Sequence, residues 1–563
     1  MLEGNFLLFD RRRCIVWPGV PQARIALRKT TRAPYADRSK VQVLPGLPGH
    51  DNTVTLSLME TTASATRGGG NVMEPLSRYW LLLGFFVVVC LSLPTHATTY
   101  TADSCSSSDV QTAFNSATHD GDIVTVPPGS CTWTSTVAPP CSSWTLEGSG
   151  AGSTNITVNN SGGNGIAISS CSGKSVRITG FTWTRQATAA EGMFHTTGGT
   201  GLSFRIDHNT LNSTGGWGRW AWFNVPCVAP GCVVDHNTIT DVGIEIAAEL
   251  SSDGGYAGCG GSPDNCAGLT QWNRPMVFDN GSEVYFENNT FSFDNYYDND
   301  MLDCMNGGRY VFRYNTVTGN DIFNHGYDSV AESCLELTAY HNTITGGGGP
   351  GNYLTQANIL YRGGTGLVYQ NIMKYSYTGS IAVTNYRSNN SGYADIHTPY
   401  CGGGNPIDGN ITNGRPCYEQ IGRGSSSTAP GLASYPLYEW DNCKTALGCT
   451  GTNDQNTITV YNAISGWTID NTTADIAQNR DFYDSVSSFN GTAGVGIGVL
   501  SSRPASCTTG VAYWAMDTTK LYQCSSPNNW TVYYTPYTYP HPLQGGGGGT
   551  APAPPTGLTA TIM

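Results

Sequence analysis

One short phrase, built around Asn-Thr and a following apolar residue, recurs along the middle of the chain and decides the fold. It reads FRIDHNTL (204–211), CVVDHNTI (232–239), VYFENNTF (284–291), YVFRYNTV (310–317), LTAYHNTI (337–344) and, more weakly, LVYQNIM (367–373). Its Asn residues stand at 209, 237, 289, 315, 342 and 371, in steps of 28, 52, 26, 27 and 29 residues, and 52 is two steps of 26. A repeat of this length is typical of a solenoid.

Each phrase predicts a strand, a tight bend and a second strand. Apolar and polar residues alternate before the Asn, and an apolar residue returns two positions after it. Asn suits the bend because its short polar side chain tolerates the left-handed conformation. On coils stacked about 4.8 Å apart, the Asn side chains can also hydrogen-bond to one another as a ladder. The repeat therefore predicts a β-helix.

Composition and charge agree with a turn-rich all-β protein and exclude several classes. Charged residues make up 12% of the 563 residues, about half the usual share, whereas Gly (70) and Tyr (30) are abundant. Residues 98 to 563 carry 17 Lys+Arg and 35 Asp+Glu, a net charge of −18. Such acidity argues against binding nucleic acids or anionic membranes, because both need a basic surface.

The N-terminal region carries an export signal. Arg78 precedes a 13-residue apolar run, Leu81 to Leu93, which is too short to span a bilayer but suits a signal-peptide core. We assign the signal peptide to residues 73–97, with a membrane anchor as the alternative, and expect no membrane insertion after cleavage. Residues 1–72 carry a net charge of +5 and no apolar period. We interpret them as a misassigned or disordered extension.

The cysteines indicate the same compartment. Without Cys14 and Cys90, 16 remain, an even number. Disulfides persist in oxidising compartments, so we expect a secreted protein whose loops are linked by disulfides. The sequence contains no CxxC pair, which argues against a zinc site. Close spacing suggests the pairs Cys227 with Cys232, Cys259 with Cys266, Cys401 with Cys417, Cys443 with Cys449 and Cys507 with Cys524.

A period near 27 with an aliphatic-Asn-Thr-aliphatic signature resembles the right-handed parallel β-helix of the pectate lyase and polygalacturonase superfamily, the pectin lyase fold. GDIVTVPPGSCTW (121–133) looks like a first coil, preceded by a helix-like cap at 109–118, and WTLEGSG (144–150) and VRITGFTW (176–183) look like further coils. We predict a right-handed parallel β-helix over 98–475, with GWTIDNTT (466–473) as a last coil. The resemblance implies an architecture and not one reaction.

The C-terminal part lacks the repeat and has a different composition. Residues 480–543 contain the Cys507 to Cys524 loop and the aromatic run TVYYTPYTYPHPL, which predict a small β-rich, disulfide-containing appendage. Residues 544–563 hold five glycines and APAPPTGLTATIM, a linker followed by what resembles the truncated start of a fibronectin type III domain.

The resemblance places catalytic residues on one lateral face, on the strand that follows the long loop after the Asn bend. There the densest acidic segment is FDNYYDNDMLDC (293–304), with Glu245 and Glu249 on a neighbouring coil. Carboxylates on adjacent coils approach to about 5 Å, close enough to share a proton or to hold Ca²⁺. The alternative is a solvated turn, because Asp and Asn cap their own backbone.

A glycoside hydrolase would use two of these carboxylates as acid and base. In that case we expect Asp300 or Asp303 as the acid, Asp328 or Glu332 as its partner, and His325 in support. The aspartate pairs and GHG-type phrase of polygalacturonases are missing, with only Asn324-His325-Gly326 as an echo.

A polysaccharide lyase would instead use Ca²⁺ and a basic residue. Asp294, Asp298 and Asp300 are the candidate Ca²⁺ ligands, and Arg309 and Arg274 are the available bases that could take the proton α to a uronate carboxylate. The arginine motif typical of pectate lyases is absent.

Aromatic residues near these loops could stack on sugar rings. GGWGRWAWF (215–223) offers several Trp residues beside an Arg, although Trp222 could equally belong to the core. The expected substrate-binding residues are Trp217, Arg219, Trp220, Tyr296 and Tyr297. His208, His236 and His341 share one slot of the repeat, and we interpret them as structural.

These observations favour a secreted, monomeric, carbohydrate-active protein, a lyase or hydrolase that acts on an extracellular polysaccharide. The net charge of −18 somewhat favours neutral glycans. The alternative is a non-catalytic surface adhesin or glycan-binding scaffold, because a fold alone does not decide function.

Overall fold

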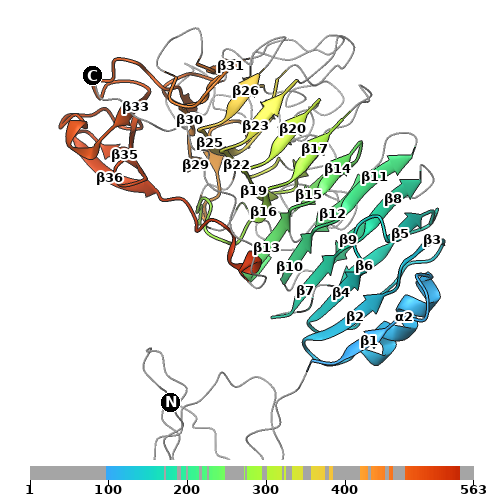
Figure 1. The fold of residues 1–563 in the computed structure, drawn as a ribbon. Helices are drawn as coiled ribbons and strands as arrows, with labels where there is room; N and C mark the ends of the chain where they lie inside the picture. The colour runs from blue at the N-terminus through green and yellow to red at the C-terminus, as the bar shows by residue number, and fades with distance from the viewer. Residues whose placement is uncertain are drawn as a thin grey trace, which may run out of the picture. The chain divides into compact units, whose positions relative to one another are not determined.

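The chain folds as an all-β, right-handed parallel β-helix, seen in a computed structural model (Figure 1). The structure describes residues 97–169, 171, 173–186, 192–197, 201–214, 219–224, 227–247, 272, 275–293, 301–319, 322–324, 333–346, 357–374, 380–384, 419–428, 431, 433–449, 455–460 and 476–545. The predicted signal peptide before Ala97, the 1–72 extension, the GWTIDNTT coil and residues 546–563 lie outside these ranges. Within them, no helix is long and apolar enough to cross a bilayer.

Three parallel sheets form the walls of the helix, and the coils between Trp144 and Val383 each contribute one strand to each wall. Sheet 1 contains, in spatial order, β1 (Thr99–Thr101), β2 (Asp122–Val126), β4 (Trp144–Gly148), β7 (Ser175–Thr179), β10 (Leu202–Asp207), β13 (Cys227–Asp235), β16 (Val284–Glu287), β19 (Arg309–Arg313), β22 (Glu336–Tyr340), β25 (Thr365–Tyr369), β30 (Leu437–Trp440) and β32 (Phe482–Tyr483). Sheet 2 contains β3 (Gly129–Trp133), β5 (Thr154–Val158), β8 (Thr182–Gln186), β11 (Thr210–Thr214), β14 (Thr238–Thr240), β17 (Thr290–Ser292), β20 (Thr316–Thr318), β23 (Thr343–Thr345) and β26 (Ile372–Lys374). Sheet 3 contains β6 (Ile166–Ser169), β9 (Phe194–Thr197), β12 (Arg219–Asn224), β15 (Gly243–Ala247), β18 (Leu302–Met305), β21 (Ile322–Asn324), β24 (Ile359–Tyr361), β27 (Ile381–Val383) and β31 (Ile458–Val460).

A short helix covers the first coil. Helix α2 (Ser107–Ser116) begins after Ser106, whose side chain accepts a hydrogen bond from the amide of Asp109. It buries Val110 and Phe114, and the Phe114 ring packs edge-on against Trp144 at 5.1 Å. The apolar end of the solenoid is thereby shielded from water, as the helix-like stretch predicted.

The predicted asparagine ladder is present at the bend from sheet 1 to sheet 2. The side-chain oxygen of each Asn accepts hydrogen bonds from the previous Asn, from its backbone amide at 2.9–3.2 Å and from its side-chain amide at 2.9–3.2 Å. The ladder joins Asn209, Asn237, Asn289, Asn315, Asn342, Asn371 and Asn442. Asn442 is a rung that the sequence did not predict.

The expectation that Asn itself takes the left-handed conformation is wrong. Positive φ angles fall on the residue before each Asn, for example 55° at His208, 58° at Tyr314 and 56° at His341. The Asn side chain must point inward to reach the next rung, and the preceding residue makes the reversal that turns it there. A positive φ is energetically unfavourable for residues other than glycine, and the hydrogen bonds of the ladder offset this cost at each of these bends.

The interior of the solenoid is a continuous column of apolar side chains. Strands of sheet 2 bury the residue between two outward Thr positions, such as Trp183, Ile239 and Val317, each fully buried. Trp183 lies within 5.4 Å of Trp133 and 5.0 Å of Phe194, both edge-on. This column fixes the register of all three walls.

The outer face of sheet 1 is partly covered by the C-terminal end of the chain, as Figure 1 shows. We call residues 484–534 the C-terminal module and residues 535–545 the strap. The module is a four-stranded sheet of β33 (Val495–Gly498), β34 (Ala512–Ala515), β35 (Lys520–Ser526) and β36 (Asn529–Tyr534), closed by the Cys507–Cys524 disulfide. The strap ends in the 3₁₀ turn η4 (Pro542–Gln544) beside β13. The remaining short elements are β28 (Arg423–Gly424), β29 (Ala433–Ser434) and η3 (Leu500–Ser502).

Sheet 1 changes character along the solenoid, which explains where the module packs. In one outward row, Asp207, Asp235 and Glu287 give way to Arg313, and then to aromatic side chains. The rings of Tyr340, Tyr369 and Trp440 stack at 4.6 and 4.3 Å, within 12° of parallel. Trp514 of the module packs on this stack, 5.4 Å from Tyr369 and 5.1 Å from Trp440. Apolar burial therefore anchors the module at the aromatic end.

Six disulfides join the described cysteines. Three connect pairs that close spacing suggested: Cys227–Cys232, Cys443–Cys449 and Cys507–Cys524. Three others, Cys105–Cys131, Cys141–Cys171 and Cys304–Cys334, link positions 26 to 30 residues apart, about one coil. The pairs 259/266 and 401/417 lie outside the described residues.

Candidate functional site

Chemically active residue types share one row on the outer face of sheet 3. In the strand register, His195 of β9 pairs with Trp222 of β12, Trp222 pairs with Glu245 of β15, and Glu245 pairs with Asp303 of β18. The residues flanking this row, such as Leu302 and Cys304, are fully buried in the core. Because side chains alternate along a strand, His195 and Asp303 face away from the core. Positions 222 and 245 share their register, but the side chains of Trp222 and Glu245 are outside the description.

Asp303 is the described carboxylate best placed for chemistry. It is half-buried, and its Oδ1 atom is inaccessible to water and has no hydrogen-bond partner among the described residues. The next residue, Cys304, is tied to Cys334 at the start of the following coil, which holds β18 in place. Register partners on adjacent strands lie about 4.8 Å apart, so positions 245 and 303 can form a carboxylate pair.

His195 is a member of the row that the sequence did not single out. Its ring is buried, and Nδ1 lies 3.1 Å from the side-chain Nδ2 of Asn164, one coil earlier. This contact joins β9 to the preceding coil. Nothing in the sequence marks this residue, since it belongs to no repeat or recurrent spacing.

Most of the predicted site residues lie outside the described part of the chain. These are the predicted catalytic residues Asp300, His325, Asp328 and Glu332, the Ca²⁺ ligands Asp294 and Asp298, the aromatic residues Trp217, Tyr296 and Tyr297, the candidate base Arg274 and the neighbouring carboxylate Glu249. The backbone of Arg219 and Trp220 lies in β12, but their side chains are outside the description. Their predicted roles stay predictions.

Arg309 does not lie with Asp303. It is the first residue of β19 in sheet 1, whereas Asp303 is in sheet 3. Its guanidinium donates to Glu336 at 3.1 Å and to the carbonyl of Val277, and it lies 3.8 Å from Glu283. Burial alone would lower the pKa of Arg309, but the two glutamates raise it above its ordinary value. Arg309 is therefore a poor candidate for a catalytic base at Asp303.

A second concentration of ionisable groups is buried between sheet 1 and the strap. Asp279 accepts hydrogen bonds from the hydroxyls of Tyr285, Tyr340 and Tyr534 and from the amide of Tyr537, at 2.7–3.1 Å. Burial, and then the charge of Glu283, raise the pKa of Glu336 to about 8, against the opposing charge of Arg309. Perturbed carboxyls often mark active sites. Here every group is buried and paired, so the cluster is best explained as the joint that fixes the strap.

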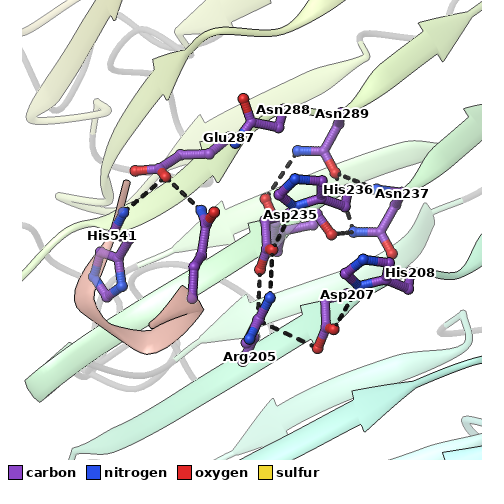
Figure 2. Close-up of polar contacts among 12 residues, drawn as sticks. Arg205, Asp207, His208, Asp235, His236, Asn237, Glu287, Asn288, Asn289 and His541 are labelled. Carbon is purple, nitrogen blue, oxygen red and sulfur yellow. Dashed lines mark hydrogen bonds and ion pairs between the residues drawn. The ribbon is translucent and has the colours of Figure 1, made fainter. Parts of the chain in front are cut away.

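The histidines at the bend are structural, as the repeat predicted for this slot. Figure 2 shows His208 and His236 beside the ladder, each with Nδ1 at 2.8 Å from the preceding Asp. Their rings stack at 5.1 Å and 3°. Arg205 binds both oxygens of Asp235, at 2.9 and 2.8 Å, and its other nitrogen donates to the Leu543 carbonyl of the strap. These contacts brace the bend.

One group of potential metal ligands exists among the described residues, and it does not fit a metal. Asp441, Cys443 and Cys449 lie together, but the two cysteines form a disulfide and are not available as thiolates. Neither a known protein family nor a curated protein matches the chain.

Proposed function

We propose that the protein is a secreted, carbohydrate-active β-helix of the pectin lyase fold that cleaves an extracellular polysaccharide on the outer face of sheet 3. The observation that carries the proposal is the in-register pair of Glu245 and Asp303, in which Asp303 has one carboxylate oxygen buried without a partner. An acidic, disulfide-stapled chain with a signal-like segment supports export.

The pair supports hydrolysis better than elimination. Two carboxyl groups on adjacent strands can divide the roles of acid and base. One gives its proton to the glycosidic oxygen as the bond to the anomeric carbon breaks. The other takes a proton from the water that adds to that carbon. Elimination needs a base that takes the proton α to a uronate carboxylate, and Arg309 is on sheet 1, held by Glu336 and Glu283. The other candidate base, Arg274, lies outside the described residues.

The row offers more than the two carboxylates. His195, two strands from Glu245, contacts Asn164 at 3.1 Å, and position 222 between them is a tryptophan. An aromatic side chain at position 222 would stack on a sugar ring, whereas His195 is buried and would support the row without touching the sugar. A polysaccharide lying along the solenoid axis would cross positions 222, 245 and 303.

The test is depolymerisation of a polysaccharide panel by the secreted protein, with and without calcium. Reducing ends and the absorbance of unsaturated uronates are followed together. New reducing ends without unsaturation would support the hydrolase, and both signals together would identify a lyase. No product from any substrate, with a folded sample, would favour the non-catalytic scaffold.

A further inference from the structure

A pocket lies where the C-terminal module meets the β-helix, on the side of sheet 1. Its volume is about 520 Å³. One wall is the segment from Met276 to Asn280, which precedes β16, and the other is the end of β36 with the start of the strap, Val532 to Thr538. Tyr435, just before β30, completes the lining. Asp303 lies on a different sheet, so this pocket is separate from the proposed catalytic face.

The lining is unusually aromatic for a surface pocket. Five aromatic residues contribute to it: Phe278, Tyr435, Tyr533, Tyr534 and Tyr537. Tyr435, Tyr533 and Tyr537 are partly exposed and could face a ligand, whereas Phe278 and Tyr534 are buried behind them. Phe278 and Tyr533 come from opposite walls and pack at 5.5 Å. At the rim, Val277 and Val532 keep 44% and 51% of their surface exposed, an uncommon exposure for large apolar side chains in this protein. Concave, aromatic sites of a few hundred Å³ are typical of ligand-binding pockets.

The one charged side chain in the lining, Asp279, already has internal partners, among them Arg313 at 3.8 Å. The carboxylate of Asp279 receives four hydrogen bonds from tyrosines, and the carbonyl of Val277 receives one from Arg309. Other polar side chains in the lining, those of Asn280, Thr535 and Thr538, are uncharged. A charged ligand would find no counter-ion here, whereas a neutral one would lose little on entering.

The same contacts make the pocket rigid before any ligand arrives. Tyr534 is held through its hydroxyl by Asp279 at 2.7 Å and by Tyr369 at 2.9 Å, and the Tyr537 amide is held by Asp279 at 3.0 Å. A preformed site avoids the entropy cost of ordering its side chains on binding. Because its two walls come from residues about 250 apart in sequence, the pocket exists only while the module is docked.

We propose that this pocket binds a neutral pyranose unit of a polysaccharide and so serves as an accessory sugar-binding site. Aromatic faces suit the apolar faces of a sugar ring, and uncharged amide and hydroxyl groups suit its hydroxyls. The assignment depends on the pocket alone and goes beyond the proposed catalysis.

The test is native affinity electrophoresis in gels that contain xylan, galactomannan or mixed-linkage β-glucan, with polygalacturonate as the charged comparison. We expect retardation in at least one neutral gel. Val532→Arg places bulk and charge at the exposed rim and should weaken retardation by up to about tenfold, because the long side chain obstructs the pocket. Tyr435→Ala, which removes one ring, should act in the same direction.

Two controls separate the pocket from folding and from catalysis. Met516→Arg changes an equally exposed apolar residue of the same module, 54% exposed, and should migrate as the parent does. Asp303→Asn should keep its retardation, so failure of the pocket and failure of the catalytic proposal give different results. Equal retardation of Val532→Arg and the parent, retardation by polygalacturonate alone, or no retardation would overturn the assignment.

Discussion

The side-chain oxygen of Asn342 accepts two hydrogen bonds from Asn315 of the preceding coil, one from its backbone amide at 2.9 Å and one from its side-chain amide at 3.1 Å. The Asn315 side chain also donates to the carbonyls of Phe286 and Arg313. The Asn315 side chain therefore satisfies backbone groups of two coils. The residue before it, Tyr314, has the positive φ that makes the bend.

Replacing Asn315 by Ala should destabilise the solenoid strongly. The change leaves several buried polar groups without partners, so we expect the free energy of unfolding to fall by about 2 to 4 kcal/mol. Equilibrium urea unfolding measures the loss. Asn155→Ala is the matched control, because its side-chain hydrogen bonds on sheet 2 are solvent-exposed and should contribute less than about 1 kcal/mol. Equal losses would show that the ladder has no special role.

Replacing Arg313 by Ala should release the strap. Arg313 is fully buried, pairs with Glu287 and donates to the carbonyls of Tyr537 and Thr538 at 3.0 and 2.8 Å. Removing it leaves the buried Glu287 carboxylate without its counter-ion, and the loss of one partner of a buried ion pair lowers the free energy of unfolding by about 3 to 5 kcal/mol. Hydrogen exchange should rise in residues 535–545 before it rises in the coils.

The control for that experiment is Arg177→Ala. Arg177 binds Asp207 bidentately, but its side chain is 41% exposed and it makes no described contact with the strap. Exchange in the strap should not change in this variant. A strap that stays protected in Arg313→Ala would refute its role as the anchor.

Stability should decrease as the pH rises from 6.5 to 8. Burial raises the pKa values of Glu336 and Glu439 to about 8, so the folded state holds protons that the unfolded state has already lost above its pKa near 4.5. Each group then costs up to about 1.4 kcal/mol of stability per pH unit until the folded-state pKa is passed. Burial lowers the pKa values of His341 and His541 to about 4, which opposes this trend only below pH 6.5.

Urea unfolding at several pH values between 6.5 and 8 tests this prediction, and Glu336→Gln should reduce the slope. Glu283 and Asp279 face Glu336, as does Arg309, and remain in that variant. A pH-independent free energy of unfolding in the parent protein would mean that these glutamates are ionised in the folded state.

The sequence was sufficient to predict the architecture, because the Asn-Thr phrase reports both the coil period and the bend. It did not reveal Asn442, since the phrase around it, YEWDNC, lies 71 residues after Asn371 and lacks the Asn-Thr pair. The sequence also contains a signal that another part of the chain covers the outer face of sheet 1. The residue two positions before each Asn changes from Asp207 and Asp235 to Tyr369 and Trp440, and aromatic residues facing outward require a partner surface.

The candidate site could be predicted only in part. The density of acidic residues made Asp303 a candidate, and the register that pairs position 245 with it follows from coil adjacency. Arg309 was associated with the same segment because it is close in sequence. However, Asn306 and Gly307, both with positive φ, turn the chain there, and Arg309 stands six residues before Asn315, which assigns it to sheet 1. His195 and Asn164 meet through the fold alone.

Cleavage of a polysaccharide by the carboxylates of sheet 3 is tested most directly by comparing the parent protein with Asp303→Asn on the substrate that the panel identifies. The substitution keeps the shape of a half-buried side chain and removes its ionisable group. We predict a fall in kcat of at least about 100-fold, the usual contribution of a general acid or base, with an unchanged unfolding curve. Cleavage at the parental rate by a folded Asp303→Asn protein would contradict the account.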